Sequence, residues 1–396
     1  MSSGQNEASS SSTSSSKLGS LSASLNAHLS KPVAPSTSAV STTSDSASIH
    51  SITQQGFRPP KSTQNGKASP IAAGSASLAS NSELWKSSAA RRAEKAWAIQ
   101  SEKTLQSDTK FKKYAIAVEK CLATFDSVSE WADFISFLAR LLKTLQTSTQ
   151  FNAIPRKLIV AKRLSQCLNP ALPSGVHQRA LEVYEHIFTV IGPEGLRRDL
   201  SVWTPGLLPF FQFASMTVKP IVLNIIELHY LPLGQDLRPI AKPMQLALLP
   251  GLEEETSEHF ERVLRLLDKI RDSIGQPFFL QNLWMILISV PAARLPSLHY
   301  LSRRLDDLNG AEGSAKEVTS IVGPDLGLAI RAFSAALEDD TLLVRRAMLD
   351  LLAIKFKLDS KTFKELVRQD DRIRLFQSAL AVVLRRDISL NRRLYA

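Results

Sequence analysis

Three arginine pairs stand near the C-terminal end of this sequence, and their positive charge suits them to bind anions. Equivalent positions on stacked helices form a ridge, and a basic ridge favours phosphoinositide headgroups or an acidic protein partner. Salt bridges between neighbouring helices, such as Arg345 or Arg346 with Asp350, are the alternative role for these arginines. The candidate anion-binding ridge consists of Arg345, Arg346, Lys355, Lys357, Arg385, Arg386, Arg392 and Arg393.

No set of side chains has the spacing of a catalytic or metal centre. His177 and His186 are nine positions apart, which places them on opposite sides of a helix. Cys121 and Cys167 lie singly in apolar helical patterns, as buried thiols do in a reducing compartment. The sequence also lacks a phosphate-binding glycine loop, an H-E-x-x-H motif and a G-x-S-x-G motif. We therefore expect no enzyme activity, no metal ion and no cofactor.

One nine-residue pattern occurs at three places in the sequence and predicts a helix at each of them. The copies begin at Val176, Val218 and Val344, which are 42 and 126 residues apart. Each copy has a basic or imidazole side chain second, apolar side chains fifth and sixth, a polar one seventh and bulky apolar ones last. HEAT and armadillo units run to about 40–47 residues, and 126 is a multiple of 42. The predicted fold class is therefore all-α, a HEAT/armadillo-like α-solenoid.

Apolar periodicity predicts further helices along the chain, and no segment alternates as a strand would. Ser127 and Glu130 have the spacing of a capping box at the start of one helix. The apolar run 278–290 predicts a buried helix, because it is too short and too polar for a membrane span. Residues 309–323 are expected to form a flexible loop between repeats. Other helices are predicted at 205–216, 219–231, 256–274, 325–338, 341–356, 360–369 and 371–385.

Composition divides the chain into three parts. Residues 1–82 are rich in Ser and Thr and poor in aromatic residues, which predicts a disordered, low-complexity N-terminal tail. Residues 83–109 form a marginal basic helix or linker, whose Trp85 and Trp97 could touch a membrane surface or the first repeat. Residues 110–396 form the predicted helical-repeat domain.

The formal net charge of +11 is unevenly distributed. Basic and acidic residues number 10 and 5 in residues 1–107, 25 and 26 in residues 108–340, and 13 and 6 in residues 341–396. A groove that binds nucleic acid would carry its basic excess along the whole domain. We therefore expect no nucleic acid partner, although a nucleic-acid-binding or nuclear-transport helical-repeat protein remains the alternative because the pI is about 9.6.

Five segments of the chain are similar to a known family. Residues 113–122, 125–131, 154–157, 174–184 and 385–395 resemble the N-terminal region of the Dopey family. The resemblance covers about 110–396 and leaves out the Ser-rich tail. Members of this family are very long proteins, so the chain resembles an N-terminal fragment of one.

The resemblance implies a non-catalytic scaffold or adaptor in vesicle-mediated protein traffic between endosomes and the Golgi. Such a protein would be cytosolic and peripheral on the cytoplasmic face of those membranes. The implied partners are a large HEAT-repeat scaffold related to Arf exchange factors, a phospholipid flippase and a motor-protein adaptor. An anionic membrane surface that carries phosphoinositides is also implied.

Overall fold

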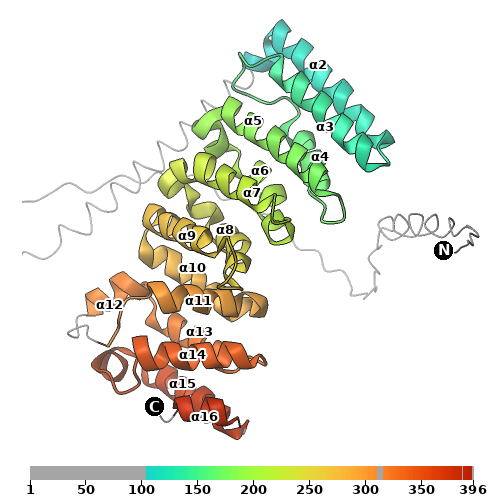
Figure 1. Cartoon of the computed structure of the whole chain (residues 1–396). Coiled ribbons are helices and arrows are strands. Elements are labelled where there is room, and N and C mark those ends of the chain that lie inside the picture. The colour runs from blue at the N-terminus through green and yellow to red at the C-terminus, as the bar shows by residue number, and fades with distance from the viewer. Residues whose placement is uncertain (1–103, 310–314, 386, 395–396) are drawn as a thin grey trace, which may run out of the picture. The chain divides into compact units, whose positions relative to one another are not determined.

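The computed structural model describes residues 104–309, 315–385 and 387–394, which form one unit. All regular elements in these ranges are helices, as predicted, and no strand occurs among them. Figure 1 shows the helices following one another in chain order, from α2 (Thr109–Ala123) at one end to α16 (Ile388–Leu394) at the other. The predicted tail, 1–82, and most of the predicted basic helix or linker lie outside the described residues.

Local hydrogen bonds and one glycine set the bounds and the direction of the first helices. The predicted capping box at 127–130 is wrong: Ser127 Oγ donates to Thr124 O (2.8 Å), and the N–H of Glu130 donates to Asp133 Oδ2 (3.2 Å). The longest helix changes direction at Gly192, where φ is 62°, a value that glycine adopts without strain. These elements are α2, η1 (Thr124–Ser127), α3 (Trp131–Gln146), α4 (Lys157–Cys167), α5 (Ser174–Arg198), α6 (Leu200–Leu207), η2 (Pro209–Phe213) and α7 (Lys219–Ile225).

The middle of the chain is the most irregular part. The predicted helix 205–216 is wrong, because Pro209 has no N–H to continue α6 and starts the 3₁₀ turn η2 instead. The predicted helix 219–231 consists of α7 and a π-helical turn. The elements that follow α7 are η3 (Ile226–Tyr230), η4 (Leu231–Ile240), α8 (Ala241–Leu248), η5 (Leu249–Leu252), α9 (Phe260–Ile274), α10 (Gln276–Ser289), η6 (Pro291–Ala293) and α11 (Arg294–Arg304).

The C-terminal part returns to regular helix pairs. The predicted loop 309–323 is wrong in its second half, where Val318 and Val322 pack into the core and hold a helix. The predicted helix 360–369 is a single π-helical turn, whose Thr362 hydroxyl donates to Leu308 O (2.8 Å). These elements are α12 (Ala315–Val322), α13 (Leu326–Leu337), α14 (Leu342–Lys355), η7 (Thr362–Leu366), α15 (Gln369–Leu384) and α16.

The helices alternate between two layers. In the first layer α2 contacts α4, α4 contacts α6, α8 contacts α10, α10 contacts α13 and α13 contacts α15. In the second layer α3, α5 and α7 contact one another in that order, and so do α11, α14 and α16. Each helix pair therefore packs against the pair before it and the pair after it.

Side-chain hydrogen bonds join neighbouring pairs at a recurrent spacing. Lys157 Nζ lies 2.9 Å from Asp199 Oδ1, 42 positions away. Trp284 Nε1 donates to Val322 O (2.9 Å) across 38 positions. Arg393 Nε donates to Asp350 Oδ1 (2.6 Å) across 43 positions. These separations are close to the 42-residue spacing of the sequence pattern.

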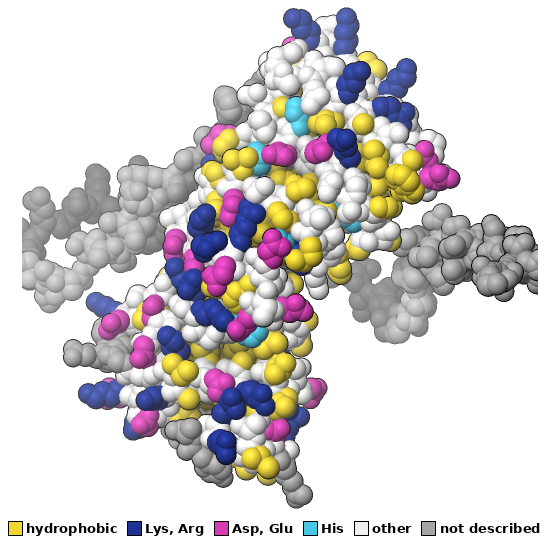
Figure 2. All heavy atoms as spheres, in the orientation of Figure 1, with side chains coloured by type: hydrophobic (Ala, Val, Ile, Leu, Met, Phe, Trp, Pro, Cys, Tyr) yellow, Lys and Arg dark blue, Asp and Glu magenta, His cyan; other side chains and the backbone are white. Residues whose placement is uncertain are grey.

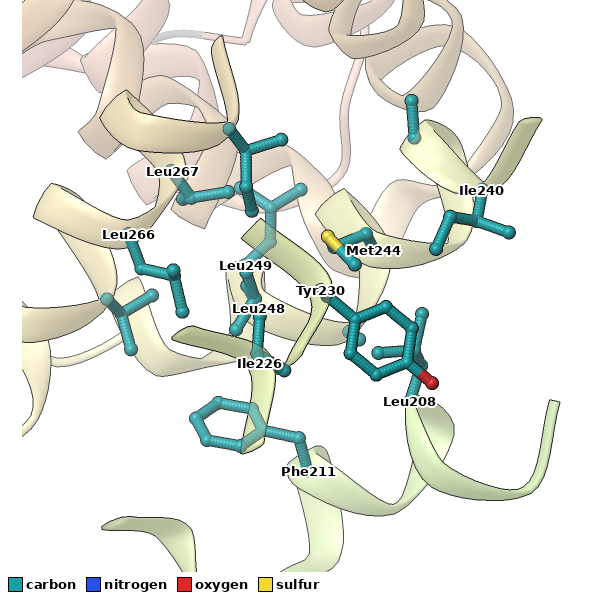
Figure 3. Close-up of a cluster of buried hydrophobic side chains, with 14 of the residues drawn as sticks. Leu208, Phe211, Ile226, Tyr230, Ile240, Met244, Leu248, Leu249, Leu266 and Leu267 are labelled. Atoms are coloured by element: carbon teal, nitrogen blue, oxygen red, sulfur yellow. The ribbon is translucent and has the colours of Figure 1, made fainter. Parts of the chain in front are cut away.

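The three copies of that pattern bury the same positions. In each copy the first, fifth, sixth, eighth and ninth residues are buried, while the polar seventh residue reaches the surface. The pattern therefore records how one face of a helix packs, as predicted. Between the second and third copies the sequence shows no clear copy, yet the core is continuous (Figure 3). The labelled side chains extend from just before the second copy to α9, and they are Leu208, Phe211, Ile226, Tyr230, Ile240, Met244, Leu248, Leu249, Leu266 and Leu267.

A buried carboxylate joins three of the C-terminal segments. Asp339 Oδ2 accepts a hydrogen bond from Arg294 Nη1 (2.6 Å), and its Oδ1 accepts one from the N–H of Thr341 (2.7 Å). Burial opposes ionisation of this carboxyl group, but the bonds from Thr341 and Arg294 outweigh burial and lower its pKa. Arg294 also donates to Leu287 O (2.9 Å), so the pair ties α10 and α11 to the turn before α14.

We expect Asp339→Ala to lower the free energy of unfolding by about 3 kcal/mol, because Arg294 would stay buried without its counter-charge. Urea denaturation followed by circular dichroism measures this change. The matched control is Asp325→Ala, which removes the exposed pair of Asp325 with Arg331 and should cost less than about 1 kcal/mol. Equal losses in the two variants would contradict the assignment.

The same pair makes stability depend on pH in a defined direction. Since the pKa of Asp339 is lowered, its contribution is complete above the ordinary value of 3.8 and is lost as the pH falls through the folded-state value. The difference in unfolding free energy between wild type and Asp339→Ala should therefore shrink below about pH 4. A difference that grows on acidification would show that another group is responsible.

Candidate functional site

The predicted ridge residues lie on and around α14 and α16, which pack against each other. Arg345 and Arg346 are in the first turns of α14, Lys355 ends it and Lys357 follows it. Arg392 and Arg393 are on α16, and Arg385 caps the C-terminal end of α15. Arg386 lies outside the described residues. Whether these residues face solvent together depends on the bonds that each one makes.

Arg345 is a structural residue. Its side chain is buried, with 7% of the residue exposed, and its Nη1 donates to Asp339 O (2.6 Å). His177, at the same second position of its pattern copy, is also buried, with its Nε2 2.9 Å from Asn169 O. In both copies the second residue thus reaches back to a carbonyl in the turn before its own helix. Arg345 is therefore unavailable to an external anion.

Arg346 and Arg393 connect α14 to α16. Arg346 Nη2 donates to Ser389 Oγ (2.8 Å), and Arg393 donates to Asp350 Oδ1 (2.6 Å) and to Ser389 O (3.2 Å). At the start of α16, hydrogen bonds from the Ser389 hydroxyl and the Leu390 N–H lower the pKa of Asp387. Asp350 does pair with an arginine, but the partner is Arg393 rather than Arg345 or Arg346.

The remaining ridge members point outward but do not converge. Arg385 Nη1 lies 3.7 Å from Asp340 Oδ1, at the N-terminal end of α14. Lys355 ends the same helix, roughly 20 Å away along its axis. Lys357 and Arg392 are exposed, with no acidic partner among the described residues. These residues form an extended surface and not a pocket for a single headgroup. We call this surface the outward ridge, and it consists of Lys355, Lys357, Arg385 and Arg392.

An exposed apolar stripe on α15, which is absent from the predicted site, ends next to Arg385. Ile373, Phe376, Leu380 and Leu384 recur at helical spacing, and Leu384 is 81% exposed. The opposite face of α15 carries Leu375, Ala379 and Val382, which are buried against the core. The signal was present in the sequence, because apolar residues occupy both faces of this helix. We call Ile373, Phe376, Leu380 and Leu384 the α15 stripe.

Metal binding and membrane crossing are two further properties on which the described residues bear. No group of three or more His, Cys, Asp or Glu side chains there is placed to hold a metal ion. No single helix there is long and apolar enough to cross a membrane. One pair bent by 51°, Lys316–Val322 with Leu326–Leu337, meets the length and composition conditions when its two helices are taken together.

The fold and this surface define an all-α protein of stacked helix pairs with extended basic and apolar faces. The family model described as Dopey, N-terminal, matches residues 108–396, and the chain belongs to this family. The predicted resemblance is thereby confirmed.

Relatives in fungi and animals support the same assignment. Protein dop1 of Emericella nidulans is 43% identical over 329 residues, which cover 74% of this chain and 18% of that protein. Protein DOP1B of Xenopus laevis is 40% identical over 300 residues, which cover 74% of this chain and 13% of that protein. Protein DOP1 of Saccharomyces cerevisiae is 34% identical over 333 residues, which cover 73% and 20%. The chain thus spans a fifth or less of these relatives, and no solved structure matches it.

The roles of two ridge arginines can be separated by substitution. We expect Arg345→Ala to lower the free energy of unfolding by about 2 kcal/mol, because a buried charged hydrogen bond and its packing are lost. Arg392→Ala should change stability by less than about 0.5 kcal/mol, as an exposed substitution does. Chemical denaturation of both variants measures the difference. Similar stabilities would show that Arg345 does not anchor the turn.

Proposed function

We propose that this chain is a HEAT-like α-solenoid that serves as a non-catalytic scaffold in vesicle-mediated traffic between endosomes and the Golgi. Its place of action would be the cytoplasmic face of those membranes. The observation that carries the architecture is the set of bonds between residues about 42 positions apart. Family membership supports the role in traffic. The alternative role in nucleic acid binding has less support, because residues 168–340 hold 15 basic and 21 acidic side chains.

The solenoid follows from where the contacts lie. In a repeat stack each unit touches only its neighbours, so cross-links join residues about one unit apart. The two layers of helices, the recurrent burial pattern and the spacing of the cross-links all agree with that arrangement. Such a stack offers long faces for binding and no closed cavity for chemistry, which supports a scaffold.

The outward ridge and the α15 stripe together form the proposed partner surface. Protein interfaces combine an apolar centre with a polar rim, and here Leu380 and Leu384 would supply the centre, with Arg385 on the rim. The occupant we propose is a helix with an apolar stripe and an acidic flank. It would belong to the large HEAT-repeat scaffold related to Arf exchange factors. A phospholipid flippase and a motor-protein adaptor would join through the same assembly.

The partner surface is tested by Leu380→Glu/Leu384→Glu. We expect co-precipitation of the Arf-exchange-factor-related scaffold with the full chain to fall about tenfold or more, because charges would replace the centre of the interface. The matched control is Met216→Glu/Leu228→Glu, which introduces the same charges at exposed apolar positions outside the partner surface and should leave co-precipitation unchanged. Binding by the first variant at the wild-type level would refute this surface.

The cellular role has a separate test. A fluorescent fusion of the full chain should co-localise with Golgi and endosome markers, because a traffic scaffold works on those membranes. Depletion of the natural protein should delay the return of an endosomal cargo to the Golgi. An even distribution in the cell, together with unchanged cargo return, would contradict the proposed function.

A further inference from the structure

The first four helices carry a concentrated positive charge. This charge is not visible when basic and acidic residues are counted over a longer segment such as 108–340. Residues 104–167 hold ten basic and five acidic side chains, whereas residues 168–340 hold fewer basic than acidic ones. Figure 2 shows basic side chains, in dark blue, gathered at the upper end of the molecule, where α2 lies in Figure 1. Few acidic side chains lie beside them in this view. This end of the stack therefore presents a positive surface.

The lysines of this end differ from the C-terminal arginines in their bonding. Two acids at this end are already paired with arginines: Glu119 Oε2 lies 3.4 Å from Arg156 Nη2, and Asp126 Oδ1 lies 2.7 Å from Arg163 Nη2. The exposed lysines of this end form no ion pair with an acidic side chain among the described residues. They are Lys110, Lys112, Lys113 and Lys120 on α2, Lys143 on α3 and Lys162 on α4.

The same two ion pairs indicate the offset between α2 and α4. Glu119 of α2 pairs with Arg156, just before α4, and Asp126 of η1 pairs with Arg163 of α4. Both pairs join residues 37 positions apart, as they would if the two helices run parallel. Leu158 is then level with Cys121, about one turn beyond Ile116. Both belong to the first layer and lie on exposed helix faces, with Ile116 64% and Leu158 68% exposed.

Lysines flank the apolar residues at one-turn spacing. Ile116 stands four positions after Lys112 and four before Lys120, and Leu158 stands four before Lys162. Residues four apart lie on one side of a helix. Ile159, 45% exposed, lies next to Leu158. These residues form a surface with apolar side chains at its centre and lysines around them. We call it the α2–α4 face, and it consists of Lys112, Lys113, Ile116, Lys120, Leu158, Ile159 and Lys162.

We propose that the α2–α4 face docks the protein on the surface of an anionic lipid bilayer. The lysines would approach the headgroups, and Ile116, Leu158 and Ile159 would enter the boundary between headgroups and acyl chains. Charge complementarity argues for a bilayer, and the exposed aliphatic side chains among the lysines add an apolar contact that a soluble anion could not use. This inference rests on the proposed function, because it names the membrane contact of the same scaffold and places it at the end opposite the partner surface.

The test is flotation of the full chain with vesicles of phosphatidylcholine alone or mixed with phosphatidylserine. The wild type should float with the mixed vesicles only. Lys112→Glu/Lys120→Glu should lower the partition coefficient about thirtyfold, since each lysine near an anionic surface contributes substantially to binding. Ile116→Ser/Leu158→Ser should lower it about tenfold, and that loss should persist when salt screens the charges.

The matched control is Arg265→Glu/Lys269→Glu, which makes the same change in charge on exposed positions of α9. This control should float as the wild type does, and circular dichroism should show all variants folded. Absence of wild-type flotation on mixed vesicles, or equal losses in the control, would overturn the proposal. Co-precipitation of the helical-repeat partner by Lys112→Glu/Lys120→Glu should stay unchanged, so failure of the membrane contact and failure of the scaffold role give different results.

Discussion

Among the residues that the structure describes, each helix pair buries apolar side chains against neighbouring pairs, and the rest of the structure depends on that packing. The pattern that begins at Val344 buries six of its nine positions, and the helices that cover them belong to adjacent pairs. The turn between two such helices must therefore be held at a fixed geometry. Arg345 and His177 do this from inside the stack, because each binds a carbonyl of the turn that precedes it. A polar side chain in an apolar pattern thus has a defined structural task.

Basic side chains are bonded differently at the two ends of the stack. At the C-terminal end Arg346 and Arg393 are used to join α14 and α16, which leaves an apolar stripe and a sparse basic rim. At the N-terminal end Arg156 and Arg163 pair with Glu119 and Asp126, while the exposed lysines of α2 form no ion pair among the described residues. Arginine suits fixed bidentate contacts, whereas lysine presents a mobile point charge. The division between structural arginine and surface lysine agrees with that chemistry.

Much of the fold could be predicted from the sequence because the repeat pattern is a packing pattern. The copies at Val176, Val218 and Val344 bury the expected positions, and the helices at 256–274 and 371–385 occur close to their predicted bounds. The predictions failed where a distant contact decides local structure. Val318 and Val322 form a helix in a turn-rich segment because they reach the core.

The candidate site was harder to predict, since its members depend on three-dimensional pairing. Nothing local distinguishes Arg345, which is buried, from Arg392, which is exposed; the difference arises from the position of the Asp339 carbonyl. The partner of Asp350 could also not be chosen before the offset between α14 and α16 was known. By contrast, the sequence does show that α15 has two apolar faces. A helix needs only one apolar face to pack against a core, so the second face is visible as an excess of apolar residues.

The spacing of the cross-links has a mechanical consequence. Because the bonds join residues about 42 positions apart, a small rotation at each interface adds to the next, and the stack can bend without breaking any one contact. Bending of this kind would divide strain among several interfaces instead of concentrating it at one. Two attachments, one at each end, would then transmit tension between a curved surface and a bound assembly while the core of every helix pair stays intact.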